Sequence, residues 1–223
     1  DTIYLQKDIK TEWSMQIKSE SKNRNINLKL VPKHKLNRLT RKNHQGVIGL
    51  ASIIVFQNFD NLLSAVFDKG VFPLFMLLDR ITDVRNFGSI CRSAEAMGVH
   101  GIIIPKKESA QINDIAVKAS AGAIININIC REDNLESIVK RAKASGLSVV
   151  ACSEKSEQNI NQINLKKPLL MIIGSENNGI SDKLIKLSDA VGKIPILGKT
   201  KSLNASVAAG IILFEYNRQQ NTN

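Results

Sequence analysis

Aromatic residues and cysteines are scarce in this chain of 223 residues, and acidic residues are fewer than basic ones. Only 4% of the residues are aromatic, so the stacking of RNA bases on exposed rings, as in an RNA-recognition motif, has few candidate residues. The three cysteines, Cys91, Cys130 and Cys152, have no metal-ligand spacing. This pattern argues against a zinc site and a disulfide framework, and it predicts reduced thiols in a reducing compartment.

Long hydrophobic runs are also missing from the sequence. The apolar run at 47–56 contains Gly49 and Ser52, and the run at 205–214 is equally short, so neither can cross a bilayer. No basic stretch followed by an apolar one opens the chain, and we expect no signal peptide. These features predict a cytoplasmic protein, or one of an organellar matrix, without a membrane partner. Because Asp1 is not an initiator methionine, the natural chain is expected to be longer.

The charge of the chain is positive and unevenly distributed. There are 31 Lys and Arg residues against 20 Asp and Glu, a formal net charge of +11. Residues 1–50 hold eleven basic and four acidic residues, and the segment 22–42 holds eight basic residues and no acidic one. Such a segment favours binding to a polyanion, since each neutralised phosphate releases counterions. The alternative is a solvated face that promotes solubility.

The first fifty residues predict a small α/β domain. The pattern favours strands at 3–5 and 26–31, a helix at 11–20 and one or two helical turns at 34–39. These elements are too few for a complete core, so the domain at 1–56 is expected to be the back half of a larger one. A linker is expected at 57–72, with a helical pattern inside it.

From residue 73 onward, apolar strands alternate with helices. Six strands are expected, at 74–78, 101–104, 124–129, 148–152, 169–173 and 190–196. Five helices are expected, at 87–97, 114–120, 134–144, 181–187 (with Ser181 as its N-cap) and 203–216. Strands that are almost wholly apolar and alternate with helices predict a parallel sheet covered on both faces.

Two loops after predicted strands carry polar residues and glycines. Ligands of parallel sheets bind beyond the carboxyl ends of the strands, in loops of this kind. The loop after 74–78 leads to Asn86 and Arg92, and the alternative interpretation is a helix cap and a surface arginine. The loop after 169–173 holds Gly174, Glu176 and Gly179, and it lacks the dinucleotide fingerprint G-x-G-x-x-G.

A third loop runs into the last predicted helix. Lys199 and Lys201 precede Ser202 and Asn204, where the free N–H groups of a helix start can attract an anion. The alternative is that Ser202 or Asn204 only caps the helix. For any one of the three loops taken alone, helix capping or a surface position explains the residues at least as well as ligand binding does.

Taken together and in this order, the three loops resemble the motifs of the SpoU/TrmH family of RNA ribose 2′-O-methyltransferases, in the SPOUT superfamily. The motif N-x-G-x-x-x-R-[ST]-A is met by Asn86, Gly88, Arg92, Ser93 and Ala94. The motif G-[SA]-E-x-x-G is met by Gly174, Ser175, Glu176 and Gly179. The motif S-L-N-x-S-x-A is met by Ser202, Leu203, Asn204, Ser206 and Ala208. Two departures are Val84, where the family often has Pro, and Asn177–Asn178, which replaces a commoner pair containing Gly.

The resemblance implies an α/β fold in which a parallel-sheet SPOUT methyltransferase domain, at 73–218, ends in a deep C-terminal trefoil knot. The segment 36–49 is similar to the end of the L30e-like domain of the ribosomal RNA branch, so a partial L30e-like domain is expected at 1–56. Residues 219–223 are then a polar tail. Pattern alone would instead favour an open sheet, because knots are almost absent from folds.

The resemblance also implies a cofactor and a set of site residues. S-adenosylmethionine, with no metal, is expected on Gly174, Glu176, Ile194, Ile196 and Leu203. The residues expected to act on the substrate are Asn86, Arg92, Glu176, Ser202 and Asn204. Because a guanidinium stays protonated in proteins, Arg92 is interpreted as a phosphate clamp and not as a base.

The implied substrate is a ribose 2′-hydroxyl of 23S-type ribosomal RNA, with a guanosine as the candidate nucleotide, and the implied assembly is a homodimer through the knotted domain. The residues expected to bind RNA are Lys33, Lys35, Arg38, Arg41, Lys42, His44, Lys199 and Lys201. The alternatives are a tRNA 2′-O-methyltransferase and a non-catalytic RNA-binding or ribosome-assembly protein of the same fold.

Overall fold

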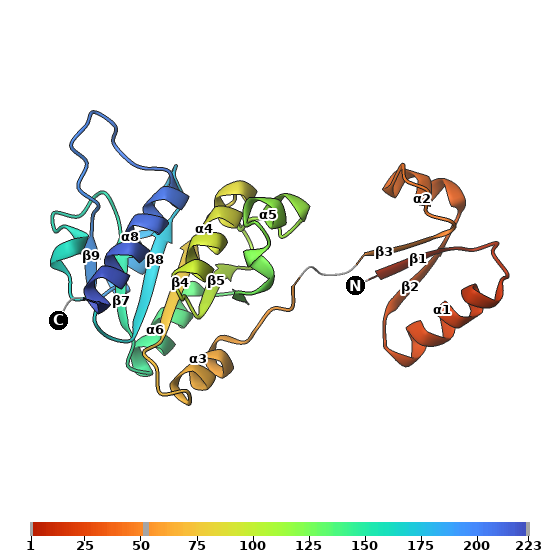
Figure 1. The fold of residues 1–223 in the computed structure, drawn as a ribbon, viewed down its shortest axis with the longest axis horizontal. Coiled ribbons are helices and arrows are strands. Elements are labelled where there is room, and N and C mark those ends of the chain that lie inside the picture. Colours follow the sequence, from red (N-terminus) through yellow and green to blue (C-terminus); the bar gives the residue numbers. More distant parts are fainter. Residues whose placement is uncertain (1, 51–53, 222–223) are drawn as a thin grey trace. The chain divides into compact units, whose positions relative to one another are not determined.

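The computed structural model describes residues 2–50 and 54–221, and the chain divides into two compact units (Figure 1). The amino-terminal unit is Asp1–Ile53 and the carboxy-terminal unit is Ile54–Asn223. The boundary lies within the apolar segment 47–56 of the sequence, three residues before the expected end of the first domain. Each unit is described separately.

The amino-terminal unit is a three-stranded sheet with two helices. Its elements are β1 Thr2–Gln6, α1 Glu12–Asn23, β2 Asn27–Val31, α2 Lys33–Leu39 and β3 Val47–Leu50. The strand order is β2-β1-β3, with β2 parallel and β3 antiparallel to β1. Helices α1 and α2 lie on opposite sides of this sheet (Figure 1). All four elements predicted between residues 3 and 39 are confirmed.

The core of the amino-terminal unit is small. Three large apolar side chains, Leu5, Val31 and Leu36, are buried among its described residues. Five others are exposed: Trp13, Met15, Leu30, Leu39 and Leu50. The unit therefore buries little apolar surface of its own, as its few elements led us to expect.

The carboxy-terminal unit contains the predicted parallel sheet. Its six strands pair in the order β6-β5-β4-β8-β7-β9, and every pair is parallel. The strands are β4 Leu74–Asp79, β5 Gly101–Pro105, β6 Asn128–Glu132, β7 Ser148–Cys152, β8 Leu169–Gly174 and β9 Ala190–Gly192. The helices are α3 Phe59–Phe67, α4 Val84–Ala96, α5 Asp114–Ala119, α6 Leu135–Ala144, α7 Asp182–Leu187 and α8 Ala205–Gln220. The short 3-10 helices are Ala123–Ile125 and Ile160–Gln162.

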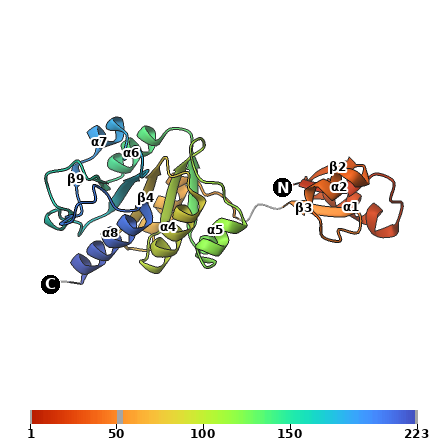
Figure 2. The ribbon, with the colours of Figure 1, turned by 90° about the horizontal axis from the view of Figure 1, so that it is seen from above.

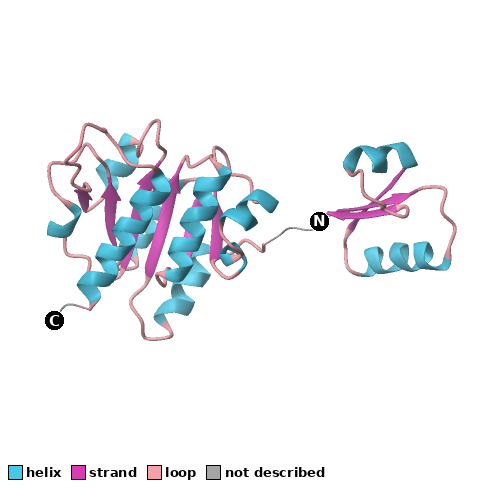
Figure 3. Ribbon diagram, turned by 45° about the horizontal axis from the view of Figure 1, so that its top comes forward, coloured by secondary structure: helices cyan, strands magenta, loops and turns pink. Residues whose placement is uncertain are grey.

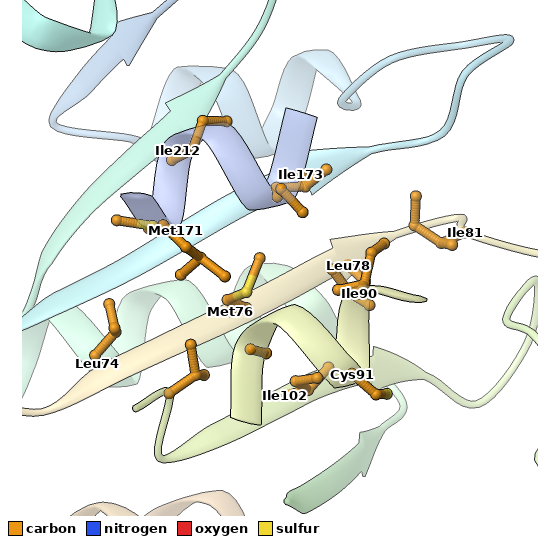
Figure 4. Close-up of a cluster of buried hydrophobic side chains, with 14 of the residues drawn as sticks. Leu74, Met76, Leu78, Ile81, Ile90, Cys91, Ile102, Met171, Ile173 and Ile212 are labelled. Atoms are coloured by element: carbon orange, nitrogen blue, oxygen red, sulfur yellow. The ribbon is translucent and has the colours of Figure 1, made fainter. Parts of the chain in front are cut away.

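Helices cover both faces of this sheet (Figures 2 and 3). Buried side chains of α4, α5 and α8 form one core with one face, and those of α3, α6 and α7 form a second core with the other. Successive strand residues point to opposite faces, so Met76 and Leu78 of β4 lie in the first core while Phe75 and Leu77 lie in the second. Figure 4 shows the first core between β4, β8 and their covering helices.

Two predicted strands differ from the structure. The strand expected at 124–129 begins only at Asn128, because the positive φ of Gly122 (+86°) leads into the 3-10 helix Ala123–Ile125. The strand expected at 190–196 ends at Gly192 as β9. Pro195 lies just beyond this end, and its missing N–H could not continue the ladder.

The segment expected to be a linker, 57–72, contains an integral part of the carboxy-terminal unit. Helix α3 begins after its N-cap, Asn58, whose side chain accepts a hydrogen bond from the Asn61 N–H. Phe59, Leu63 and Val66 of α3 are buried, and the Phe59 ring meets the edge of Phe75 at a centroid distance of 5.4 Å. This contact fixes α3 on the sheet. The threading of the chain through a knot stays a prediction.

Candidate active site

Helix α4 begins at the carboxyl end of β4, and its first turn presents Asn86. The N-cap is Asp83, whose Oδ1 accepts a hydrogen bond of 2.7 Å from the Asn86 N–H. The interpretation of Asn86 as the cap is therefore wrong. Because Asp83 satisfies this helix end, the side-chain amide of Asn86 is left to bond elsewhere.

The loop after β8 is a tight turn held by two glycines. Gly174 pairs with Asp79 of β4, and a Cβ on Gly174 would lie 2.1 Å from the carbonyl carbon of Gly179. Gly179 has a φ of +61°, and its N–H donates to the Ser175 carbonyl at 2.8 Å. No side chain fits at Gly174, so the turn closes on itself and places Glu176 at its tip.

The carboxylate of Glu176 connects the three motif loops. Its Oε1 accepts hydrogen bonds from Asn86 Nδ2 at 2.9 Å, from the Ala205 N–H at 3.1 Å, and from Asn204 Nδ2. Asn204 Nδ2 also lies 2.9 Å from Asn86 Oδ1. The charge sits at the amino end of α8, where the helix dipole stabilises an anion. We refer to Asn86, Glu176 and Asn204 as the amide–carboxylate network.

Asn204 has two functions at once. Its Oδ1 accepts hydrogen bonds from the N–H groups of Ser206 (3.0 Å) and Val207 (3.4 Å), so it is the N-cap of α8 as the structural interpretation proposed. Its amide nitrogen belongs to the network with Glu176. Capping of α8 by Asn204 Oδ1 therefore fixes the direction in which Asn204 Nδ2 points, toward the other two motif loops.

A cavity of about 600 Å³, including its open mouth, lies beside this network at the carboxyl ends of β7 and β8. We call it the first cavity. All five residues expected to bind the cofactor line it: Gly174, Glu176, Ile194, Ile196 and Leu203. Ser202 lines it as well. Its walls are mostly apolar, and its lining among the described residues includes the carboxylates of Glu154 and Glu176 but no lysine or arginine.

Sequence reasoning missed the residues that β7 contributes to the first cavity. Cys152, Ser153 and Glu154 line it. They follow an apolar strand of a parallel sheet, so the same rule that selected the other loops could have found them. Burial raises the pKa of the Cys152 thiol to about 12, and it does the same for Cys91 and Cys130. The thiols are therefore protonated at neutral pH, and all three cysteines are free.

A second cavity, of about 330 Å³ with its open mouth, adjoins the first. Ser175, Glu176 and Ala205 line both cavities, so the tip of the β8 loop separates them. The other lining residues come from the loop after β4 and from the β8 loop: Arg80, Ile81, Thr82, Asp83, Asn86 and Asn177. Apart from Asn86, the sequence analysis selected none of them as site residues.

Three predicted residues of this unit do not join the site. Arg92 is exposed on α4 and lines neither cavity, and its side chain has no hydrogen bond or ion pair within the described part of the chain. Lys199 and Lys201 are exposed in the loop before α8 and also lie outside both cavities.

In the amino-terminal unit, four of the predicted RNA-binding residues line one hollow: Lys33, Arg41, Lys42 and His44. Lys35 and Arg38 are exposed outside it. The His44 ring has a structural role, since its Nδ1 accepts from the Gly46 N–H at 3.0 Å and its Nε2 lies 2.8 Å from Asn37 Oδ1.

The described residues contain no helix long and apolar enough to cross a membrane. Within the same ranges, no group of three or more His, Cys, Asp or Glu side chains could hold a metal ion.

The fold and the site define an α/β protein with two adjoining cavities at the carboxyl edge of a parallel sheet. The model of the SpoU rRNA Methylase family matches residues 73–214, and a model described as RNA 2′-O ribose methyltransferase substrate binding matches residues 1–53. The chain therefore belongs to the SpoU rRNA methylase family, and it is an RNA methyltransferase. The resemblance found in the sequence is confirmed.

Relatives and solved structures agree with this family. A Bacillus subtilis (strain 168) protein assigned to the TrmH family of tRNA/rRNA methyltransferases is 35% identical over 208 residues, which span 93% of this chain and 84% of that protein. An AdoMet-bound rRNA methyltransferase of Sinorhizobium meliloti superposes with a TM-score of 0.64 and 25% identity, covering 100% of this chain and 81% of that one. A TrmH/SpoU tRNA-modifying enzyme of A. aeolicus superposes with a TM-score of 0.62 and 27% identity, covering 72% and 84%. The predicted α/β fold class is confirmed.

Proposed function

We propose that this chain transfers a methyl group from S-adenosylmethionine to a ribose 2′-hydroxyl of ribosomal RNA. One observation carries the proposal: the amide–carboxylate network brings all three motif loops together beside the first cavity, which Glu176 lines. Residues separated by up to 118 positions meet there through side-chain hydrogen bonds. A cap or a surface loop alone would not require this convergence.

The first cavity fits the cofactor chemically. S-adenosylmethionine carries a sulfonium and an ammonium against one carboxylate, so its net charge is positive. The carboxylates of Glu154 and Glu176 complement that charge. Ile194, Ile196 and Leu203 supply apolar walls for the adenine. The S. meliloti relative was solved with AdoMet bound.

The bound cofactor supplies the activated methyl group, and the chain supplies alignment. Holding a 2′-hydroxyl in line with the methyl can lower the barrier by roughly 7–11 kcal/mol through proximity and orientation. Glu176 fixes the amides of Asn86 and Asn204, and these amides position the ribose. Ser202 lines the first cavity and forms part of its wall on the side where the substrate binds.

Arg92 clamps an RNA phosphate and stabilises developing charge. Its guanidinium stays protonated, so proton loss from the hydroxyl is assisted by an RNA phosphate or by water. Arg92 lies outside both cavities of its own chain and is exposed. We therefore assign it to the site of a second copy, in a homodimer whose active sites are shared across the interface.

An apolar stripe on α8 supports this homodimer. Val207, Ile211 and Phe214 are exposed at a spacing of four and three residues, so they lie on one side of the helix. The last of these is a large side chain with 61% of its surface exposed. An exposed apolar stripe of this kind is typical of an interaction surface. Helix α4, which carries Arg92, packs directly on α8, where Gly210 faces Ser93.

The amino-terminal unit delivers the RNA. Its basic residues surround a hollow, and its sequence matches the substrate-binding model.

The rRNA enzyme of S. meliloti covers the whole chain, whereas the tRNA enzyme of A. aeolicus covers 72% of it, which favours rRNA as the substrate. Lys199 and Lys201, in the loop before α8, are two further cations that bind RNA. Three free cysteines are consistent with the cytoplasm or an organellar matrix.

The test is methylation of total RNA by the purified protein with tritiated S-adenosylmethionine, followed by mapping of 2′-O-methyl positions. We expect label in large-subunit rRNA at a single ribose. Label in tRNA alone would replace the rRNA substrate with the tRNA alternative. No label in any RNA, with cofactor binding intact, would favour the non-catalytic RNA-binding alternative.

A further inference from the structure

We propose that the second cavity receives the nucleobase of the nucleotide whose ribose is methylated, with Thr82 and Asn177 as specificity-determining residues. The proposal rests on the function proposed above and names the part of the site that selects the substrate. The cavity encloses about 330 Å³ when its open mouth is included, so part of a bound group would stay in contact with solvent.

One wall of the second cavity is an arginine held rigidly in place. Asp79 at the end of β4 is buried, with 4% of its surface exposed. Its Oδ1 and Oδ2 accept hydrogen bonds from Arg80 Nε and Nη2, both at 3.2 Å, and Oδ2 also accepts from the Ser181 N–H at 2.7 Å. Arg80 Nη2 reaches the Gly179 carbonyl at 3.3 Å.

The backbone conformation of Arg80 also indicates that this residue is held in a fixed position. Its φ of +58° is unusual for a residue with a side chain and costs free energy unless the surroundings compensate. The compensation is the contact with Asp79 and the β8 loop. Arg80 therefore joins the loop after β4 to the loop that carries Glu176, and the cavity between these loops is formed before any RNA binds.

The charges around the second cavity favour a neutral group over a phosphate. Asp83 and Glu176 contribute two carboxylates, and Arg80, the single cation of the lining among the described residues, is already paired with Asp79. A phosphate would meet a net negative lining. Thr82, Asn86 and Asn177 supply neutral donors and acceptors, and Ile81 and Ala205 supply apolar surface. Polar edges around apolar surface suit a planar base, whose edge forms hydrogen bonds and whose face is apolar.

The position of the cavity agrees with the chemistry of a nucleotide. In a ribonucleotide, the base is attached at C1′ and the methyl acceptor at the adjacent C2′. Glu176 and Ala205 form the wall between the two cavities. A base in the second cavity would thus hold its 2′-hydroxyl at this wall, beside the cofactor cavity and within reach of the amide–carboxylate network. Enzymes that modify nucleotides often bind a base removed from its stack in this way.

The test compares Asn177→Ala with Asn178→Ala, an exposed neighbour in the same loop whose side chain does not line the cavity. Steady-state methylation is measured on a short RNA carrying the mapped site, and on three RNAs in which only the target base is changed. We expect Asn177→Ala, and likewise Thr82→Ala, to raise KM for the natural RNA about 3- to 10-fold, as expected for a lost hydrogen bond. Discrimination among the four bases should fall by a similar factor. Asn178→Ala should match the wild type.

Cofactor affinity is measured by calorimetry in the same variants and should be unchanged. A weakened affinity for S-adenosylmethionine in Asn177→Ala would place the cofactor tail in the second cavity and overturn the proposal. Unchanged KM and unchanged base discrimination in both Thr82→Ala and Asn177→Ala would overturn it as well. Failure of the proposed function is distinguishable, because the wild-type protein would then methylate no 2′-hydroxyl.

Discussion

Glu176 accepts a hydrogen bond of 2.9 Å from the side-chain amide of Asn86, a residue ninety positions earlier in the chain. The bond joins the loop after β8 to the first turn of α4. Since β4 and β8 are adjacent and parallel, their carboxyl ends lie at the same edge of the sheet. The same carboxylate oxygen also accepts hydrogen bonds from Asn204 and from the first residue of α8. This one oxygen atom therefore holds the three motif loops together.

Replacing Glu176 with Gln should lower the rate of methyl transfer. The amide keeps an oxygen acceptor but loses the charge, and hydrogen bonds to a charged group contribute about 1.5–3 kcal/mol, which corresponds to roughly 10- to 150-fold in rate. Single-turnover kinetics with saturating cofactor measure this effect. Glu157→Gln, an exposed residue outside the first cavity, is the matched control. Equal rates for the two variants would remove Glu176 from the site.

Replacing Arg92 with Ala should abolish methyl transfer while cofactor affinity stays nearly unchanged. Loss of one preorganised electrostatic contact at a reacting group typically costs about 100-fold or more in rate. Arg92→Lys should recover little activity, because an ammonium lacks the planar fork of a guanidinium. Rates are compared with the Kd for S-adenosylmethionine. Full activity of Arg92→Ala would contradict the assignment.

Mixed dimers test whether Arg92 serves the site of a second copy. A hybrid of one Arg92→Ala subunit and one Glu176→Gln subunit contains one site with both native residues only if Arg92 acts across the interface. We expect co-purified hybrids, isolated with two affinity tags, to regain about half the wild-type activity per dimer, whereas Arg92→Ala alone stays inactive and Glu176→Gln alone keeps only its reduced rate. A hybrid no more active than Glu176→Gln would place Arg92 in the site of its own chain.

Replacing Phe214 with Asp should dissociate the dimer. A carboxylate would be buried without a partner in the apolar stripe of α8, and a large interface side chain commonly contributes about 2 kcal/mol or more, which corresponds to at least about 30-fold in Kd. Light scattering across a concentration series measures the mass. Phe72→Asp is the matched control, because Phe72 is 60% exposed and precedes β4, so it is not part of the apolar stripe of α8. A monomeric wild type would contradict the homodimer.

Acidification below the ordinary pKa of a histidine should destabilise the carboxy-terminal unit, because His100 is partly buried there. Burial lowers the pKa of His100, and its Nδ1 accepts a hydrogen bond of 3.1 Å from the Leu74 N–H. The unfolded chain binds the proton more readily than the folded one, so stability is full above the ordinary pKa of about 6.5 and falls as the pH drops below it. Thermal unfolding at pH 7.5 and 5.5 should show a larger decrease in Tm for the wild type than for His100→Gln. Equal decreases would exclude this histidine as the cause.

Replacing Arg41 and Lys42 together with Gln should weaken RNA binding and its dependence on salt. Each lost phosphate contact lowers the slope of log K against log salt concentration by about 0.7–0.9. Both residues line the hollow of the amino-terminal unit. A Lys10/Lys18 double Gln variant changes the net charge equally outside that hollow and controls for nonspecific electrostatics. Identical slopes for the two double variants would place the RNA elsewhere.

Much of the fold could be predicted from local pattern. The strands at 74–78 and 169–173 are almost wholly apolar, and a segment of that kind must be buried on both faces. The errors occur where local pattern and tertiary packing disagree. The sequence predicts a linker with a helical pattern where α3 packs on the sheet, because the contact of Phe59 with Phe75 cannot be inferred from either segment alone. The apolar run after Gly122 predicts a strand, although the positive φ of this glycine leads into a 3-10 helix.

The family, the parallel sheet and the polar residues of the three loops follow from motif spacing and hydrophobic periodicity, because these are local properties of the chain. How these residues act together depends on the packing of the chain. This packing made Asp83 and not Asn86 the cap of α4, directed Asn86 and Asn204 onto Glu176, and left Arg92 outside both cavities. It also formed the second cavity from Arg80 and Asn177, which no motif selects. Such relationships depend on distances between residues far apart in the chain, and only the packed sheet sets those distances.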